Sequence, residues 1–240
     1  MTPPSHHAYA PDSPGPSSVT PPDDAFAESL RGFGVVGILA AVVVLVVGGW
    51  LGPLRAVPAL LWTWRSRTPW REIGYVRPRS WIGGLLVGVA GGVAFKFVLK
   101  AVVMPLLGAD PINHAYHFMV GNTSALPFMV LLMIAGGGIG EETVFRGFLF
   151  ERLGKLLGTG AAARVATVLI TTTLFSAAHY PEQGLAGSAQ ALITGSVFGA
   201  VYAVTRRLWP LMCAHAAFDL AALAIIYWNR ETDVAHLIFK

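Results

Sequence analysis

From Gly32 to Leu54 the sequence reads GFGVVGILAAVVVLVVGGWLGPL, which is 23 residues without a charge. About 20 apolar residues in a helix cross the hydrocarbon core of a bilayer. The 240-residue chain as a whole is also apolar: 54% of all residues are hydrophobic and only 12% are charged. A soluble domain carries about 25% charged residues. The composition therefore excludes a water-soluble globule and predicts one membrane-embedded domain.

Further apolar stretches bring the predicted number of membrane spans to about six. They cover residues 81–107, 111–140, 165–180, 186–205 and 211–228. The glycines between Gly136 and Gly140 could break a helix, and such a break would raise the number of spans to seven or eight. The predicted fold class is an all-α, polytopic transmembrane helix bundle. A Pro-rich, disordered tail is expected before it, because residues 1–24 hold seven of the sixteen prolines and no Lys or Arg.

The basic residues indicate topology, and a nucleic-acid partner is not expected. The net charge is +4, but nucleic-acid binding needs basic residues clustered on one face. With six spans and the N-terminal tail outside, eleven Lys and Arg fall in inside loops and three in outside segments. This excess matches the positive-inside rule. The single cysteine, Cys213, excludes a disulfide framework and a four-cysteine zinc site.

Three short patterns place ionisable residues within apolar stretches, where a charge is costly and therefore a candidate for function. Each pattern contains two residues spaced i, i+4, which share one helix face. The patterns are Glu141-Glu142-Thr-Val-Phe-Arg146, Phe175-Ser-Ala-Ala-His179 and His215-Ala-Ala-Phe-Asp219. Brought together, they would supply carboxylates and two imidazoles in a low-dielectric setting, which is the inventory of a water-activating hydrolytic site.

A role can be predicted for each of these residues. Removal from water makes a carboxylate a better general base near neutral pH, which suits Glu141. A water between Glu141 and His179 could then attack a peptide carbonyl, while His215 stabilises the oxyanion. Asp219 would accept a ring N–H of His215 and fix its tautomer. Glu142 would be held ionised by the neighbouring guanidinium, that of Arg146.

Each pattern alone has a simpler interpretation. A Glu-Arg pair on one helix is usually a structural ion pair, and a lone histidine in an apolar helix is usually a packing residue. Three patterns in three different stretches are harder to explain in this way, because buried polar groups need partners and these residues are the evident partners for one another. The simple six-span arrangement would, however, separate His179 and His215 in depth by about 13 Å, so tilted or broken helices would have to bring them together.

The ordered triplet of motifs resembles the CPBP family, the intramembrane glutamic endopeptidases that include type II CAAX prenyl proteases and bacterial bacteriocin-processing or self-immunity proteins. The resemblance extends over about residues 125–228. It implies that Glu141 and His179 activate water and that His215 and Asp219 stabilise the transition state, with Glu142 and Arg146 in support. Many members carry Asn in place of Asp219. An ionised aspartate cannot donate to an oxyanion, so orientation of His215 is the role expected for it here.

The resemblance divides the chain into four parts. A disordered tail is expected over 1–28 and N-terminal transmembrane helices with an Arg-rich cytoplasmic loop over 29–124. The CPBP-like protease core covers 125–228, and a C-terminal tail covers 229–240.

Two other functions stay open. In one, a zinc protease binds its metal through His179, His215 and Glu141, because these side chains are also zinc ligands. The leading hypothesis needs no metal or other cofactor, and neither histidine belongs to a His-Glu-x-x-His motif. In the other, the chain is a non-catalytic immunity factor or chaperone, or a proton-coupled transporter.

The expected partners are the lipid bilayer and a peptide or membrane-protein substrate, which is CAAX-like by resemblance or a bacteriocin-type precursor. The Arg-rich, Ala- and Gly-rich composition is typical of bacteria and favours a multi-pass protein of the bacterial plasma membrane. The oligomeric state stays open. Lys96 and Lys100 share a helix face and are expected to snorkel toward the interface, with a role in holding an acidic or lipidic substrate as the less favoured alternative. His114 and His117 have no evident third metal ligand nearby.

Overall fold

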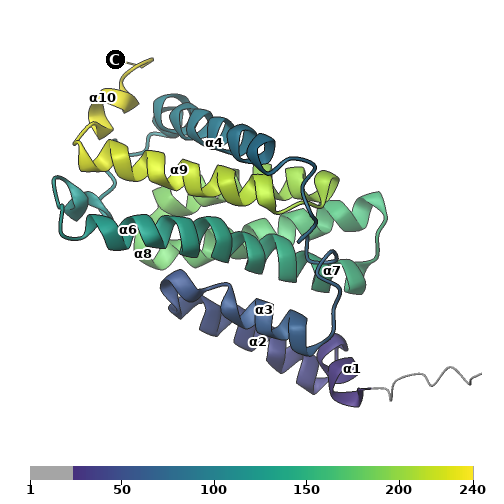
Figure 1. Cartoon of the computed structure of the whole chain (residues 1–240). Coiled ribbons are helices and arrows are strands. Elements are labelled where there is room, and N and C mark those ends of the chain that lie inside the picture. The colour runs from purple at the N-terminus through teal and green to yellow at the C-terminus, as the bar shows by residue number, and fades with distance from the viewer. Residues whose placement is uncertain (1–23, 240) are drawn as a thin grey trace, which may run out of the picture.

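The structure is a computed structural model that describes residues 24–239, and all elements in this range are helical. The long helices pack as a bundle and run in roughly the same direction across the view of Figure 1. The elements are α1 (Ala25–Arg31), α2 (Val35–Trp50), η1 (Gly52–Leu54), α3 (Val57–Arg65), α4 (Trp81–Val98), η2 (Leu99–Val103), α5 (Met104–Leu106), η3 (His117–Met119), α6 (Leu126–Leu131), η4 (Leu132–Leu149), α7 (Phe150–Leu157), α8 (Ala161–Thr205), α9 (Trp209–Tyr227) and α10 (Glu231–Ala235).

The all-α fold is confirmed, but six spans are not. Within residues 24–239, four continuous helical segments are long and apolar enough to cross a membrane, namely 81–106, 126–157, 161–205 and 209–227. A fifth would be the pair α1 and α2, which is bent by 62°. This number takes α8 as one segment, although its backbone leaves the helical conformation at Gly184, between the predicted spans 165–180 and 186–205.

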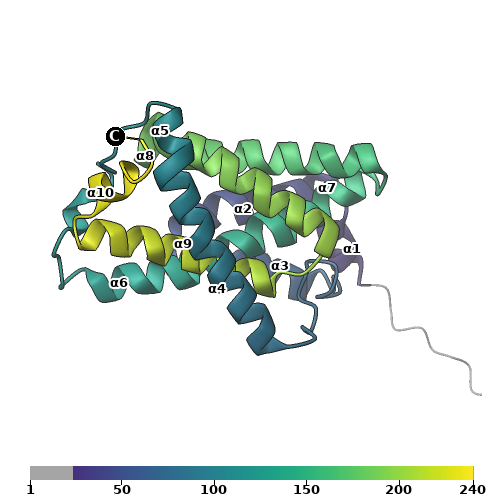
Figure 2. The same cartoon turned by 90° about the horizontal axis from the view of Figure 1, so that it is seen from above.

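The two halves of α8 fold back on each other. Gly184 has φ of 61° and ψ of −160°, a conformation outside the helical region that glycine adopts readily. On either side of it, the hydroxyl of Ser176 donates to the carbonyl of Ser188 at 2.8 Å, and a Cβ on Gly195 would lie 3.1 Å from Thr172. Figure 2 shows the two halves side by side. α8 is therefore a helical hairpin whose second half packs against the first.

The predicted third span begins later and ends later than expected. Residues 107–125 form turns, with left-handed glycines at Gly108 and Gly121. Pro127 then lies in the first turn of α6, where the missing N–H costs nothing. The helix runs without interruption from Leu126 through η4 to Leu157, so the acidic motif lies inside a span.

The helix does not break at Gly136–Gly140, where the sequence left a break open. These glycines lie within η4, a stretch with the wide turns of a π-helix. They allow close packing: a Cβ on Gly137 would lie 2.4 Å from Oδ2 of Asp219, and a Cβ on Gly138 would lie 2.7 Å from the Cβ of Ala216. The glycines let α9 approach the backbone of η4, which brings the third motif of the sequence toward the first.

Both chain ends are more ordered than predicted where the structure describes them. The expected tail over residues 1–23 lies outside the described residues, but residues 25–28 belong to α1, whose N-terminus is capped by Asp24. In the expected C-terminal tail, α10 packs on the bundle with Glu231 and Ala235 buried. Figure 1 shows α10 beside the end of α9. Capping and burial of these short helices offset the entropy of ordering them.

Candidate functional site

Glu142 and Arg146 form a buried ion pair on η4. The guanidinium of Arg146 donates to Oε1 of Glu142 at 2.9 Å, and the two residues are 1% and 0% exposed. Arg146 also lies 4.6 Å above the ring of Phe175 and donates to the carbonyl of Gly195 at 3.4 Å. These contacts tie η4 to both halves of α8.

The ring of His215 lies among the carboxylates. Its Nδ1 is 2.7 Å from Oε1 of Glu142. Its Nε2 is 3.6 Å from Oε2 of Glu141 and 3.6 Å from Oδ2 of Asp219. The expectation that Asp219 fixes the ring by a hydrogen bond is wrong for this arrangement, because Glu142 makes the close contact. Asp219 is left with a carboxylate that faces Nε2 without bonding to it.

His179 on α8 also directs Nδ1 at an acceptor oxygen. Its Nδ1 lies 2.8 Å from the carbonyl oxygen of Phe175. A carbonyl only accepts, so Nδ1 carries the proton in this contact and Nε2 is left as an acceptor. The ring packs 4.5 Å from that of Phe175, whose ring in turn lies 6.1 Å from that of His215. No hydrogen bond joins His179 to Glu141 or His215 among the described residues.

One cavity connects the residues that the three motifs contribute. It has a volume of about 440 Å³ and is lined by Glu141, His179, His215 and Asp219, together with the aromatic side chains of Phe145 and Phe175. This volume falls within the range of about 300–1,000 Å³ that is usual for ligand sites. The predicted site residues Glu142 and Arg146 lie behind its wall. The six residues therefore form one site, in which four side chains face the cavity and two support them.

Arg55, which follows η1, is a site residue that the sequence analysis assigned only to a basic loop. Its guanidinium pairs with Oε1 of Glu141, and it lines the same cavity. Burial lowers the pKa of Arg55, and nearby acids oppose that shift. A Cβ on Gly140 would lie 2.9 Å from the Cβ of Arg55, so the glycine leaves room for this approach. No local pattern in the sequence links Arg55 to Glu141, which is 86 positions away.

The two lysines of the α4 region differ in environment. Lys96 is 6% exposed and lines the cavity, so the expected snorkelling of this residue is wrong. Lys100 pairs with Glu231 of α10 at 3.6 Å and donates to the carbonyl of Pro111. α10 and the loop before η3 are therefore fastened to the end of the α4 region through Lys100.

His114 and His117 each contact an acid, one in the same loop and one on α10. His114 lies 2.9 Å from Asp110, and His117 lies 3.2 Å from Glu231. In residues 24–239, no three side chains of His, Cys, Asp or Glu are grouped as a metal site would require. The trio of His179, His215 and Glu141 does not have that grouping.

The fold and site define a polytopic helical protein of the membrane type with a polar site enclosed among its helices. Residues 123–221, which hold all three motifs, match the family model described as type II CAAX prenyl endopeptidase Rce1-like. The match confirms, over these residues, the resemblance to the CPBP family of membrane-embedded proteases. No curated protein and no solved structure matches the chain.

Proposed function

We propose that the protein is an intramembrane endopeptidase that hydrolyses a peptide bond with water activated by Glu141 and His179. The observation that carries this proposal is the approach of Glu141 to His215, with 3.6 Å between Oε2 and Nε2, at the wall of the cavity that His179 also lines. Both Glu141 and the free Nε2 of His179 can accept a proton from one water. Two acceptors suit a general base, since neither group has to donate.

In the proposed reaction, the water oxygen attacks the scissile carbonyl carbon while its proton passes to Glu141. The carbonyl oxygen becomes an oxyanion, which His215 stabilises by donating a hydrogen bond from Nε2. Glu142 fixes His215 through Nδ1, so Nε2 points to the cavity. The proton on Glu141 then passes to the amide nitrogen, the C–N bond breaks, and the acid and amine products leave.

Asp219 has a positioning role in this scheme. The carboxylate of Asp219, 3.6 Å from Nε2, holds this edge of the ring in place electrostatically without occupying the N–H that the oxyanion needs. Arg146 pairs with the same oxygen of Glu142 and so holds this carboxylate in place. Glu142 therefore orients the ring of His215, which is the role that the sequence had led us to expect for Asp219.

The proposed setting is a multi-pass protein of a bacterial plasma membrane that acts on CAAX-like tails, bacteriocin precursors or other membrane peptides. The prenyl endopeptidase family supports the first of these substrates, and the composition of the chain supports the others. No cofactor is assigned to the reaction.

The test is hydrolysis of quenched peptides, farnesylated and unmodified, by purified protein in liposomes. Glu141→Gln is expected to reduce kcat by about 10²–10⁴-fold, the usual contribution of a general base, whereas Glu28→Gln on the exposed face of α1 keeps the wild-type rate. Cleavage by Glu141→Gln at the wild-type rate would overturn the proposal and favour a non-catalytic role. Activity abolished by chelation and restored by zinc would favour the metalloprotease.

A further inference from the structure

Lys96 on α4 is a buried cation that the proposed mechanism does not use. Its ammonium donates to Oε1 of Gln190 at 3.0 Å and lies 4.7 Å from the ring centre of Phe218. Only 6% of the residue is exposed. A charge within a membrane span is costly and is normally paired with an opposite charge. The contacts of Lys96 are an amide oxygen and an aromatic face, neither of which carries a full negative charge.

Two acids on neighbouring elements face other basic groups, and a third, Glu182 of α8, lines both cavities without forming an ion pair with Lys96. Glu231 pairs with Lys100 at 3.6 Å and with His117 at 3.2 Å. Asp219 has Oδ2 3.6 Å from Nε2 of His215. No carboxylate in the described part of the chain forms an ion pair with Lys96, so its ammonium can accept an anion from outside the protein.

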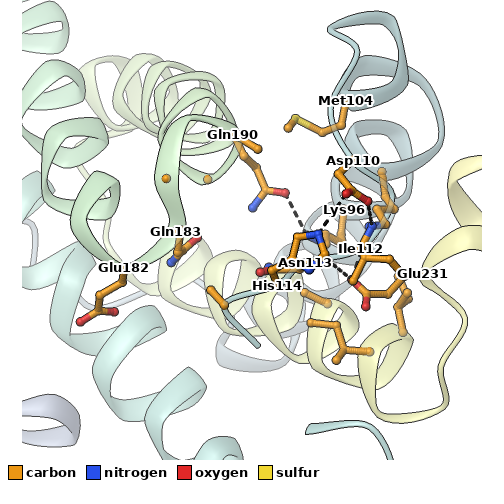
Figure 3. A pocket seen from close by; sticks show the side chains of 18 residues that line it. Lys96, Met104, Asp110, Ile112, Asn113, His114, Glu182, Gln183, Gln190 and Glu231 are labelled. Carbon is orange, nitrogen blue, oxygen red and sulfur yellow. Dashed lines mark hydrogen bonds and ion pairs between the residues drawn. The ribbon is translucent and has the colours of Figure 1, made fainter. Parts of the chain in front are cut away.

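Lys96 borders two cavities at once. A second cavity of about 360 Å³ lies between the α4 region, α8, the C-terminal half of α9 and the loop around Asn113, and it shares Lys96, Asn113 and Gln190 with the catalytic cavity. Figure 3 shows Gln190 extending from α8 toward Lys96. A peptide chain that leaves the catalytic centre toward this side would meet the ammonium where the two cavities join.

We propose that Lys96 is a specificity-determining residue that binds the free α-carboxylate of a peptide substrate, with the amide of Gln190 as a second donor. This inference rests on the proposed endopeptidase function. Lys has three N–H donors and Gln190 can present its NH₂ group, which together match the two oxygens of a carboxylate. An extended peptide spans about 3.3 Å per residue. Because the ammonium and the catalytic groups line one cavity, cleavage would fall within a few residues of the substrate's C-terminus.

The experiment compares two quenched farnesylated peptides that differ only in a C-terminal carboxylate or carboxamide. The wild-type protein in liposomes is expected to cleave the acid with a kcat/KM higher by about tenfold or more, the size of a charge-assisted hydrogen bond. Lys96→Met, which keeps the length of the side chain, should bring the acid-to-amide ratio close to one, and Lys96→Arg should restore it. Lys100→Met is the matched control and should keep the wild-type ratio, because Lys100 pairs with Glu231.

Equal cleavage of acid and amide by the wild-type protein, or an unchanged ratio in Lys96→Met, would overturn the assignment. A third peptide with an Asp side chain near an amidated C-terminus separates the two sources of carboxylate, since preference for it over the plain amide would assign the site to a side chain instead. If Lys96→Met does not fold, a tripeptide acid and its amide are compared as inhibitors of cleavage by the wild-type protein. Equal inhibition by the two contradicts the proposal.

Failure of the proposed function gives a different result. A thermal shift by the tripeptide acid, absent with the amide, reports carboxylate binding even in a protein that cleaves nothing. Loss of hydrolysis in all peptides with this shift intact would retain the Lys96 site and remove the endopeptidase.

Discussion

Oε1 of Glu142 lies 2.7 Å from Nδ1 of His215 and 2.9 Å from the guanidinium of Arg146. One carboxylate oxygen therefore joins the first and third motifs of the sequence in the buried centre of the bundle. The contact assigns Glu142 to orientation of the histidine, and it leaves Glu141 as the acid that faces the cavity. This division of two adjacent acids is the basis of the predictions on the site.

Arg146→Met should destabilise the protein. Removal of one partner of a buried ion pair leaves an uncompensated charge, here on Glu142, at a cost of about 3–5 kcal/mol. The measurement is unfolding of the purified protein by SDS titration. The double variant with Glu142→Gln removes both charges and should lose less than the sum of the two single variants, while additive losses would contradict the coupling.

His179→Ala is expected to lower kcat by about 10²–10⁴-fold, because the water loses an acceptor. His236→Ala, at an exposed position after α10, should match the wild type. Residues that act on one step are not additive, so the double variant His179→Ala and Glu141→Gln should be little slower than the slower single variant. A rate equal to the product of the two single effects would show that they act separately.

Arg55→Ala should reduce kcat more than it changes KM, since Arg55 positions the carboxylate of Glu141 through an ion pair. Arg55→Lys keeps a cation and should recover part of the activity. The expected loss for Arg55→Ala is about tenfold, corresponding to about 1.4 kcal/mol. A pure rise in KM would instead assign Arg55 to substrate binding.

Gly137→Ala and Gly138→Ala should each destabilise the packing of η4 on α9. The added Cβ would lie 2.4 Å from Asp219 and 2.7 Å from Ala216, respectively, and overpacking of this kind costs about 1–3 kcal/mol. Gly91→Ala on α4 is the control, because a Cβ there meets nothing within 4 Å. It should be neutral or stabilising by up to about 1 kcal/mol. Destabilisation by Gly91→Ala of the same size would contradict the packing argument.

The attachment of α1 should weaken in acid. The N–H of Ala27 and then the guanidinium of Arg65 hold the pKa of Asp24 below its usual range. A carboxyl with a lowered folded pKa stabilises the fold above its unfolded pKa of about 3.9 and loses that contribution as pH falls through the folded value. The amide of Ala27 should therefore be less protected from hydrogen exchange than the other α1 amides below about pH 4. In Asp24→Ala the low protection should be present at neutral pH and independent of pH.

Much of the site could be predicted from the sequence because the physical cost of burying a charge is local information. Glu141, Glu142, Arg146, His179, His215 and Asp219 are conspicuous in apolar stretches, and the structure brings all six into one site. The i, i+4 spacing also predicted the ion pair of Glu142 with Arg146. The residues that the sequence analysis missed, Arg55 as a partner of Glu141 and Lys96 as a wall of the cavity, have no such local signal.

The span number was predicted less well, since hydropathy does not report where a helix turns. The apolar stretch that begins at Pro111 contains a loop, so its helix begins only at Leu126, whereas the reversal at Gly184 falls between the predicted spans 165–180 and 186–205. Glycine-rich sequence is compatible with both a break and close packing. At Gly137 and Gly138 the neighbouring α9 packs against the glycines, and the helix stays unbroken.

The sequence by itself determined that the chain is an all-α protein of the membrane type and which acids and imidazoles it carries at depth, because composition and helical spacing depend only on residue order. The tertiary structure alone decided which groups meet. The packing of α8 and the close approach of α9 to η4 bring histidines from separate helices to one cavity. They also place Nδ1 of His215 against Glu142 instead of Asp219. Such contacts depend on the packing of segments far apart in the chain, which no local pattern specifies.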